Sequence, residues 1–509
     1  MTARRRVLAG LSCAAAVAAL AGATLVSAAP RATAARPGAH HPIAIVSQPI
    51  RHAGRWLTDA KGRVLLIHGI NVSMKGTLAQ SQAYHFGADD AAFLAANGFN
   101  AVRLTVERYD VEPSPGRFDT AYLSFLQHTI ATLARYHLLT LVDFHQDEFG
   151  PVFRDNGYPA WMTQTGGLPN LTSVGFPFQY LANPAVNHAF DTLWNNGNDT
   201  RGKPLWTDDA QILARVVGAL KSTPGVLGFE ILNEPWPGTT YAACLPFLVG
   251  CPTFDRGRFS AYYAAMDRAI RAQDTKHLVF YEPLVTFNYG IPSSVVPPPG
   301  DGRLGFSFHD YPLCSAADDV GLGGALDTAC GVESKLAIDN AVRYATSHHT
   351  ALLETEFGAT RNAAAITQST AAYDASLVPW MFWSYDELVG TTSHGAFTSP
   401  PGTAPDRAVL GGLARAYPQL VAGTPMSYSY NPKTHVFAAT YSTSHVAGPG
   451  RFPANSVSQF EIPRVAYPHG YAVTVSGGAA VSGSADSLLL VASAKGASTV
   501  TVTVTPSPL

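Results

Sequence analysis

The sequence predicts an α/β fold, a (β/α)8 TIM barrel, followed by a small C-terminal antiparallel β-sandwich. Eight short apolar runs lie between about residues 46 and 420, and helical patterns separate several of them. After about residue 421 the pattern changes to an alternation of apolar and polar residues. A doubly wound sheet is the alternative for the first part, but no glycine-rich phosphate loop follows the first apolar run.

Length and composition limit the classes of protein to which the chain can belong. It has 509 residues, of which 47% are hydrophobic and only 14% are charged, so it can bury a large core and is not disordered as a whole. Its net charge is −2, and no long basic run follows the first residues. These features argue against nucleic acid as the main partner.

The N-terminus has the layout of an export signal. Arg4, Arg5 and Arg6 precede an apolar run from Val7 to Val26, and small residues follow. We therefore expect residues 1–29 to be a cleaved signal peptide, although a membrane anchor is the alternative. Residues 30–45 are expected to be a flexible linker before a catalytic domain at 46–420 and a β-sandwich domain at 421–509. The mature protein is then expected to be secreted.

Export changes the interpretation of the cysteines. Four cysteines remain after the signal, and four cysteines allow three disulfide connectivities. The pairs Cys244–Cys251 and Cys314–Cys330 are favoured because each closes a short loop. A zinc site is the alternative, but the spacings are loose and no Cys-x-x-Cys motif occurs. We expect these cysteines to staple loops and to have no catalytic role.

The apolar runs are continuous, as expected for parallel strands that are covered on both faces. The runs are Val64–Ile70, Ala101–Val106, Leu138–Phe144, Val226–Leu232, Leu278–Tyr281, Leu304–Phe308, Ala351–Thr355 and Val378–Trp383. Helical patterns are found at Asp89–Asn97, Ala121–Tyr136, Asp208–Ser222, Arg258–Ala272 and Ser334–Ser347. Alternation at His435–Ser442, Tyr471–Ser476 and Ser498–Val504 predicts half-exposed strands of the C-terminal domain, which is either a structural cap or a binding module.

Polar residues lie at the carboxyl ends of six of the predicted strands. They include Arg103 on the second strand, His145 and Asp147 after the third, Asn233 and Glu234 after the fourth, His309 and Tyr311 after the sixth, Glu356 on the seventh and Trp383 on the eighth. Each of them alone has a structural explanation, such as core packing. In a barrel, however, all these strand ends converge on the face where active sites are built.

Two carboxylates on separate strands suggest glycoside hydrolysis. One carboxyl group must donate a proton to the leaving oxygen, while the other must be ionised to attack the sugar. Glu234 and Glu356 would face each other across the barrel mouth, and a separation of about 5–5.5 Å would mean retention of configuration. Glu354 is the alternative nucleophile, and strand position alone permits either order of the two roles.

The strand-end residues resemble those of glycoside hydrolase family 5, which places its catalytic glutamates on strands four and seven. The near-invariant positions of that family correspond to Arg103, His145, Asn233, Glu234, His309, Tyr311, Glu356 and Trp383. Within the family, four longer strings are similar to those of the endoglycoceramidases: Asp143–Gly150, Gly225–Gly238, Phe306–Tyr311 and Thr355–Gly358. The segment Tyr467–Tyr471 resembles part of their β-sandwich. The resemblance covers nearly the whole mature chain.

The resemblance implies a role for each of these residues. Glu234 would be the acid/base and Glu356 the nucleophile, with Tyr311 and Arg103 keeping Glu356 ionised and His309 supporting Glu234. The sugar would be bound by Asn233, His145, Asp147 and Trp383, and by Lys75, for which a surface salt bridge is an equal alternative. We expect no cofactor and no metal, because no metal, nucleotide or flavin motif is convincing.

The leaving group of the substrate must be inferred from the loops around the barrel mouth. The segment Phe149–Trp194 is long for a loop and rich in aromatic residues, so it either walls an apolar cleft or packs against the barrel. We expect a retaining hydrolase that cleaves glycan from ceramide and touches a membrane or micelle transiently. One alternative is another family-5 β-glycosidase, acting on steryl or aryl glucosides, disaccharide glycosides or β-glucans. The other is an inactive glycan- or lipid-binding protein on the same scaffold.

Overall fold

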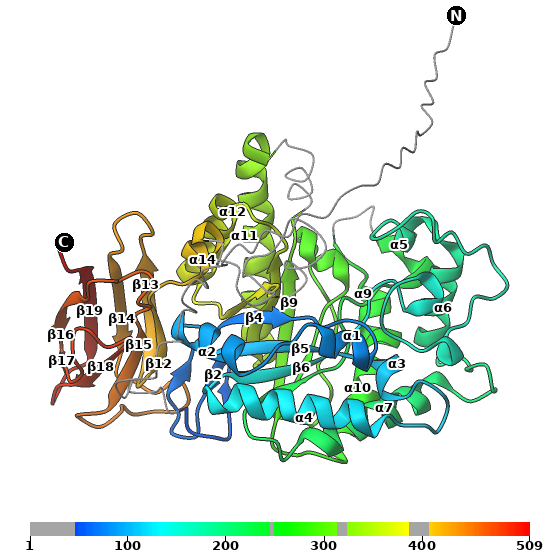
Figure 1. Ribbon diagram of the computed structural model, residues 1–509, viewed down its shortest axis with the longest axis horizontal. Coiled ribbons are helices and arrows are strands. Elements are labelled where there is room, and N and C mark those ends of the chain that lie inside the picture. The colour runs from blue at the N-terminus through cyan, green and yellow to red at the C-terminus, as the bar shows by residue number, and fades with distance from the viewer. Residues whose placement is uncertain (1–45, 245–248, 313–322, 386–406, 509) are drawn as a thin grey trace, which may run out of the picture. The chain divides into compact units, whose positions relative to one another are not determined.

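The computed structural model describes residues 46–244, 249–312, 323–385 and 407–508. Eight parallel strands form a closed barrel in the order β10-β11-β4-β5-β6-β7-β8-β9 (Figure 1). Their bounds are β4 His68–Val72, β5 Ala101–Glu107, β6 Leu139–His145, β7 Val226–Glu230, β8 Leu278–Tyr281, β9 Leu304–Asp310, β10 Ala351–Gly358 and β11 Trp380–Trp383. The predicted barrel is confirmed, and nearly every residue of these strands is buried because both faces are covered.

Helices surround the barrel. The longer ones are α2 Ala88–Ala96, α4 Thr120–Arg135, α6 Pro184–Trp194, α7 Leu205–Leu220, α10 Ser260–Arg271, α11 Gly323–His348 and α12 Ala363–Ser376. The shorter ones are α1 Leu78–Ala83, α3 Arg108–Val111, α5 Gln179–Ala182, α8 Tyr241–Cys244, α9 Pro252–Phe254 and α14 Arg407–Leu413. Helix α4 begins where the Asp119 carboxylate accepts hydrogen bonds from the backbone N–H groups of Ala121 and Tyr122.

The first predicted barrel strand, Val64–Ile70, is wrong in its first part. Only β4 belongs to the barrel, whereas β3 Val64–Leu65 pairs with β12 Tyr417–Val421. Both pieces are buried, and the apolar run Val64–Ile67 continues past the end of β3, which concealed the point where the chain passes from one sheet to the other.

Two antiparallel sheets form the C-terminal part, as the alternating sequence pattern predicted. One contains β1 Arg51–Ala53, β2 Trp56–Thr58, β3, β12, β15 Val457–Glu461, β18 Leu488–Ser493 and β17 Gly478–Ala480, in that order. The other has the order β13 Thr424–Tyr430, β14 Phe437–Ser442, β19 Thr499–Pro506 and β16 Tyr471–Ser476. Three strands from before the barrel therefore complete a sheet whose other members come from after it.

A buried polar cluster joins the barrel to this C-terminal part. The Asp374 carboxylate of α12 accepts a 2.7 Å hydrogen bond from the Tyr428 hydroxyl and lies 3.1 Å from the Arg415 guanidinium. The His68 ring, at the start of β4, stacks between Trp380 and Tyr417 at centroid distances of 4.2 and 3.6 Å. Burial lowers the pKa of His68 to about 4, so this ring is neutral at pH 7.

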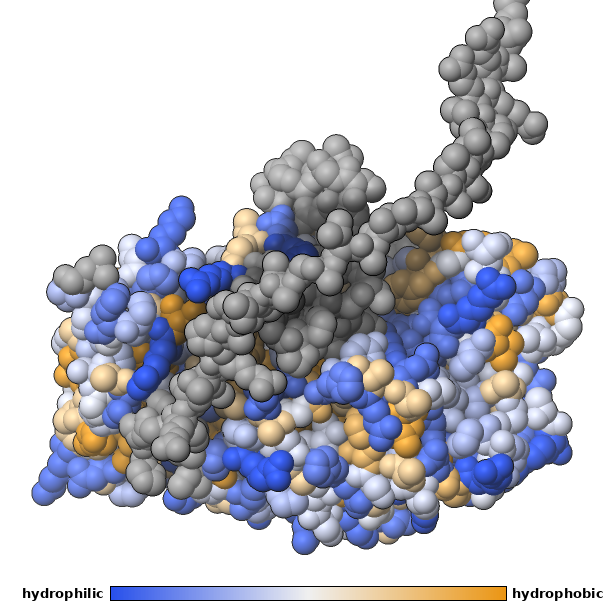
Figure 2. Space-filling view, in the orientation of Figure 1, coloured by the Kyte–Doolittle hydropathy of each residue, from blue (hydrophilic) through white to orange (hydrophobic). Residues whose placement is uncertain are grey.

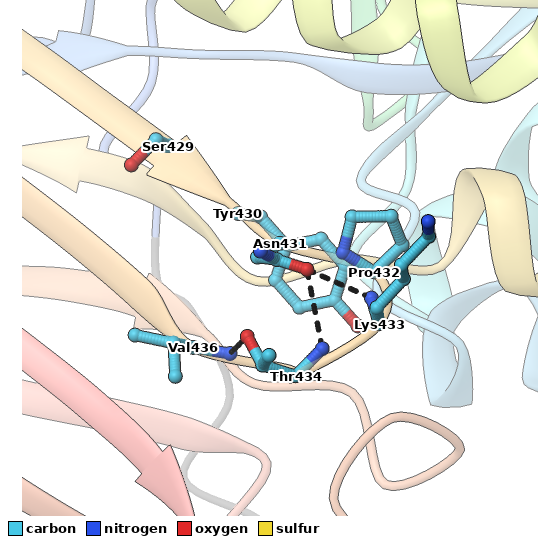
Figure 3. Close-up of a pocket in the computed structure, with 7 residues that line it drawn as sticks. All are labelled: Ser429, Tyr430, Asn431, Pro432, Lys433, Thr434 and Val436. Atoms are coloured by element: carbon cyan, nitrogen blue, oxygen red, sulfur yellow. Dashed lines mark hydrogen bonds between the residues drawn. The ribbon is translucent and has the colours of Figure 1, made fainter.

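A pocket opens at the turn between β13 and β14, at residues 429–436 (Figure 3). The Asn431 side chain shapes the turn because its Oδ1 accepts hydrogen bonds from the backbone N–H groups of Lys433 and Thr434, at 2.9 and 3.1 Å. None of the predicted site residues lines this pocket.

The disulfide expected between Cys244 and Cys251 is present, with the Cα atoms 4.9 Å apart. Cys314 lies outside the described residues, so the pair Cys314–Cys330 stays a prediction, as do the signal peptide and linker at residues 1–45. Among the helices that the structure describes, none combines the length and the apolar character needed to cross a bilayer.

We predict that Asp374→Asn destabilises the protein by about 3–5 kcal/mol, because it leaves the buried Arg415 guanidinium without its counter-charge. The measurement is the free energy of unfolding from urea denaturation. The matched control is Asp339→Asn, which breaks an exposed pair with Lys335 and should change that free energy by less than about 0.5 kcal/mol. Equal losses in the two variants would contradict the role assigned to the cluster.

Candidate active site

The predicted site residues come together at the carboxyl ends of the barrel strands. Arg103 lies within β5, His145 ends β6, Asn233 and Glu234 follow β7, and Glu356 lies near the end of β10. His309 and Tyr311 come from the end of β9 and the residue beyond it, and Trp383 ends β11. Because parallel strands all point the same way, residues far apart in sequence share one end of the barrel.

The Arg103 guanidinium lies at the centre of this group and is fully buried. It donates to the Glu230 carboxylate at 2.5 Å, to Asn233 Oδ1 at 2.8 Å and to the Glu356 carboxylate. The carboxylates of Asp143 and Glu282 lie 3.2 and 3.4 Å away. Burial alone would lower the pKa of Arg103, but the surrounding carboxylates raise it well above its usual range, so its charge is permanent.

Glu356 is held from two sides. Its Oε1 contacts Arg103, and its Oε2 accepts a 3.1 Å hydrogen bond from the Tyr311 hydroxyl. Burial raises the pKa of the Glu356 carboxyl above its usual value, and the positive charges of His309 and Arg103 oppose this effect. The pairing of β10 with β9 shifts register between Glu354 and Glu356.

Glu234 is positioned through a single carboxylate oxygen. Its Oε1 accepts hydrogen bonds from His309 Nδ1 at 2.9 Å and from Asn288 Nδ2 at 2.8 Å. Its backbone has a φ of 39°, and its N–H donates to Glu282 Oε2 at 3.0 Å. Because both hydrogen bonds described for the carboxylate go to Oε1, Oε2 is available to carry a proton.

The two histidines of the site are cationic. Burial would lower the pKa of His309, but Glu282 and Glu356 raise it well above its usual value. In His145, burial and Lys75 lower the pKa, yet Asp143 and Asp147 raise it to about 10. Both rings therefore donate hydrogen bonds at neutral pH, which fixes their orientation.

Glu234 and Glu356 face each other at short range. One oxygen from each carboxylate and one ring nitrogen of His309 all lie within 4.8 Å of one another. Asp143, His145 and Glu356 form a second group of this kind. Either group has the residue types of a metal site, but Arg103 already supplies a positive charge to both, which disfavours a second cation.

A second set of contacts forms one side of the site. The His145 ring stacks on Trp383 with ring centroids 5.3 Å apart, and Lys75 Nζ lies 4.6 Å from the Trp383 centroid. Lys75 also forms a 2.7 Å ion pair with Asp147, which lies 3.2 Å from His145 Nε2. The structure thus places Lys75 beside the other predicted sugar-binding residues and not on a remote surface.

Sequence reasoning missed three residues of the site. Asn71 and Glu282 belong to the first and fifth strands, whose ends had not been considered, and both contact Arg103. The position of each at the end of a buried apolar run was the available signal. Asn288 lies in the short 3-10 turn Val285–Tyr289, which has no periodic pattern that could have drawn attention to it.

The alternative nucleophile Glu354 lies deeper in the barrel. It is fully buried, and its Oε2 accepts a hydrogen bond from the backbone N–H of Met381 at 3.2 Å. Burial raises the pKa of Glu354 well above its usual value, which favours the neutral form of this carboxyl. Its depth and this environment disfavour Glu354 as the nucleophile.

The aromatic segment Phe149–Trp194 contains both buried and exposed aromatic residues. Phe149, Phe153, Tyr158, Tyr180, Phe190 and Trp194 are buried and pack against the barrel. Phe176 and Phe178, in contrast, are 54% and 60% exposed. The packing interpretation therefore holds for most of these aromatic residues, and the rest of the segment presents apolar surface to solvent.

Comparison with known proteins agrees with this geometry. Residues 59–388 match the family described as Cellulase (glycosyl hydrolase family 5). Residues 415–505 match the Glycoside hydrolase family 5 C-terminal domain.

Individual relatives and solved structures cover most of the chain. It is 31% identical to Endoglycoceramidase I of Rhodococcus hoagii (strain 103S), over 84% of this chain and 82% of that protein. Identity to the Endoglycoceramidase of Hydra vulgaris is 25%, over 82% and 80%. The ganglioside GM3 complex of endo-glycoceramidase II from Rhodococcus sp. superimposes with a TM-score of 0.71 at 25% identity, covering 89% of this chain and 99% of that one. The barrel, its paired glutamates and both family matches show that this chain belongs to glycoside hydrolase family 5.

Proposed function

We propose that the protein is a retaining β-glycosidase that cleaves the bond between the glycan and the ceramide of glycosphingolipids. The observation that carries the proposal is the pair Glu234 and Glu356, of which one carboxylate oxygen each lies within 4.8 Å of the other. This spacing suits attack by a carboxylate, because an inverting enzyme needs room for a water molecule and separates its carboxyl groups by about 6.5–9.5 Å. The endoglycoceramidases among its relatives support the substrate class.

In the first step an oxygen of Glu356 attacks carbon 1 of the sugar. The bond from carbon 1 to the glycosidic oxygen breaks, and Glu234 transfers its proton to that oxygen, so the lipid leaves as an alcohol. Arg103 and the Tyr311 hydroxyl stabilise Glu356 as a carboxylate before the attack. His309 and Asn288 hold Glu234 Oε1, which leaves its second oxygen for the proton.

In the second step Glu234 acts as a general base. It takes a proton from a water molecule whose oxygen attacks carbon 1, and the bond to Glu356 breaks. The glycan is released with its original configuration, because each step inverts carbon 1 once. Both glutamates return to their starting protonation states.

The remaining site residues suit binding of the sugar. The amide of Asn233, fixed by Arg103 and by the backbone carbonyl of Gln146, is placed to bond the 2-hydroxyl group. Trp383 offers an apolar ring face to the sugar. The charged group of His145, Asp147 and Lys75 supplies donors and acceptors for further hydroxyls.

Product analysis tests this function. Incubation with a ganglioside is expected to yield intact oligosaccharide and free ceramide, identified by mass spectrometry. Glucosylceramide, a steryl glucoside and a soluble β-glucan serve as comparison substrates. Turnover of the β-glucan or the steryl glucoside with the ganglioside untouched would replace the proposal by another family-5 β-glycosidase.

Variants of the two glutamates separate their roles in the same assay. Glu356→Gln should lower kcat by about 10⁴-fold or more on every substrate, because no nucleophile remains. Glu234→Gln should lower turnover of the ganglioside by roughly 10²–10⁴-fold, yet keep a burst of dinitrophenol from a dinitrophenyl lactoside, which leaves without protonation. The control is Glu354→Gln, which replaces a buried carboxyl of raised pKa by an amide of the same shape and should stay active.

We predict that Tyr311→Phe moves the acidic limb of the pH profile of kcat/KM upward by about one pH unit. Glu356 must be ionised, so activity is lost as the pH falls through its pKa, which burial already raises. Loss of the Tyr311 hydrogen bond raises that pKa further, because the bond favours the charged form.

The matched control for this profile is Tyr373→Phe. Its hydroxyl also donates to a buried carboxylate, Asp310 Oδ2 at 2.8 Å, but not to Glu356. The acidic limb of this variant should stay where it is in the wild type. A limb that does not move in Tyr311→Phe, or moves equally in both variants, would refute the role given to Tyr311.

We also propose that the protein is secreted, on the basis of Arg4–Arg6 and the apolar run that follows them. Expression with the native N-terminus should place the protein in the culture medium, and N-terminal sequencing should begin near residue 30. Retention of Met1 on a membrane-bound product would show an anchor instead.

A further inference from the structure

The amide of Gln146, the residue that follows β6, binds the backbone of two turns at the barrel mouth. The side chain is fully buried, so it does not reach a substrate. Its Nε2 donates hydrogen bonds to the backbone carbonyls of Asn233 and Glu234, at 2.9 Å each. Its Oε1 accepts a hydrogen bond from the backbone N–H of Phe149 at 2.9 Å. Both polar atoms of this amide are therefore used to hold backbone.

The backbone that Gln146 holds is strained in both turns. Glu234 has a φ of 39°, which is a left-handed conformation that a residue with a Cβ atom rarely adopts. Glu148 and Phe149, in the turn after β6, also have positive φ values, of 48° and 78°. Such conformations are costly and persist only where the surrounding contacts hold them. The Gln146 amide is a contact of this kind, and it joins the turn after β6 to the turn after β7.

The main chain of Glu234 is fixed at both of its polar groups. Its N–H donates to Glu282 Oε2 at 3.0 Å, and its carbonyl accepts from Gln146. The carbonyl of the preceding residue, Asn233, accepts from the same amide. Successive carbonyls of an extended strand point to opposite sides, so a single amide that binds both of them defines a turn. The direction in which the Glu234 side chain leaves the backbone therefore depends on Gln146.

Helix α5 packs against this amide. The Tyr180 hydroxyl of α5 lies 3.5 Å from Gln146 Nε2 and accepts a hydrogen bond from the backbone N–H of Glu148 at 2.8 Å. Figure 2 shows apolar side chains, in orange, on the surface in the region that α5 occupies in Figure 1. Tyr180 and Gln146 are both buried, so water does not compete for these hydrogen bonds.

We propose that Gln146 is a positioning residue for the acid/base, because its amide fixes the strained turn from which the Glu234 carboxyl reaches the glycosidic oxygen. The proposal deepens the proposed function and rests on the role that it gives to Glu234. The sugar-binding amide of Asn233 donates to the backbone carbonyl of Gln146, and a change of the Gln146 side chain leaves that carbonyl in place. Loss of the side chain should therefore impair proton transfer and spare attack by Glu356.

The test is the dependence of kcat/KM on the leaving group, measured with aryl β-lactosides and Gln146→Met. Methionine has nearly the shape of glutamine but donates no hydrogen bond. A dinitrophenyl group leaves without protonation, so kcat/KM on the dinitrophenyl lactoside should change less than about twofold. The phenyl lactoside needs a proton on its leaving oxygen and should be hydrolysed about 10–100-fold more slowly. Equal losses on both substrates, or no loss on the phenyl lactoside, would overturn the proposal.

The matched control is Asn100→Leu, at the amino end of the barrel. This buried amide also binds backbone through both atoms: its Oδ1 accepts from the N–H of His68 at 3.1 Å, and its Nδ2 donates to the carbonyl of Leu66 at 2.8 Å. Its loss should lower the free energy of unfolding, as loss of the Gln146 amide does, yet leave the ratio of kcat/KM on the two lactosides unchanged. A ratio that shifts equally in both variants would show a general effect of lost stability and overturn the proposal.

Azide gives a second, independent measurement on the step that releases the glycan. Water needs Glu234 as a general base to attack carbon 1, whereas the azide anion attacks without one. The bond from carbon 1 to Glu356 then breaks, and a lactosyl azide forms. Azide should raise kcat of Gln146→Met on the dinitrophenyl lactoside by at least about threefold, but not that of the wild type or of Asn100→Leu. No effect of azide on Gln146→Met would contradict the positioning role.

A second variant covers the case in which Gln146→Met does not fold. Gln146→Glu keeps the length of the side chain and the acceptor for the Phe149 N–H, but it cannot donate to both carbonyls. It should show the same selective loss on the phenyl lactoside, and a wild-type ratio would overturn the proposal.

The lactosides contain no lipid, so the test is separate from that of the ceramide-linked substrate. If the wild type hydrolyses the lactosides but leaves ganglioside intact, the proposed substrate fails, and the ratio of kcat/KM still decides the role of Gln146. A wild type that is inactive on the lactosides and on ganglioside would overturn both proposals.

Discussion

One guanidinium group organises the catalytic end of the barrel. Arg103 is fully buried and lies within 3.4 Å of the carboxylates of Asp143, Glu230, Glu282 and Glu356. A buried charge is costly unless it is paired, and here one cation serves several anions that would otherwise repel each other. It also fixes the amides of Asn71 and Asn233. The orientation of the sugar-binding amide and of the nucleophile thus depends on the same side chain.

The histidines add further positive charge next to the carboxylates of the site. His309 is charged because Glu282 and Glu356 face it, and it donates in turn to Glu234. Burial raises the pKa of Glu282 to about 7, so the charge of this carboxyl changes near neutral pH. Anionic side chains from several strands thus lie around two cations, Arg103 and His309. The charge of each cation is stabilised by neighbours of opposite sign.

Much of this arrangement could be predicted from the sequence, for identifiable reasons. Strands such as Leu278–Tyr281 are short, continuous apolar runs, and polar residues such as Glu234 follow them directly, so the barrel and its mouth could be placed. The division of Val64–Ile70 could not be predicted, because both pieces are buried and the apolar run continues past the end of β3. The role of Asn288 could not be predicted either, because this residue lies in an irregular turn whose position depends on tertiary contacts.

The aromatic segment shows a further limit of sequence patterns. Phe149 and Phe178 are the same residue type in the same loop, yet one is fully buried and the other is 60% exposed. Gln179 donates to the carbonyl of Phe153 and Asn183 to Asn170 Oδ1, and such hydrogen bonds, which fix the path of the loop, have no signature in composition.

The pairing of β3 with β12 has a consequence for how the chain matures on the ribosome. Leu65 and Val64 pair with Leu420 and Val421, so this sheet joins segments made at opposite ends of synthesis. The edge of β3 that pairs with β12 has no partner until the whole barrel has been translated. Such long-range contacts form slowly. Ending the polypeptide just after the barrel would leave that edge open permanently. The strands before the barrel and those after it therefore complete one sheet, although the sequence pattern divides the chain into two regions.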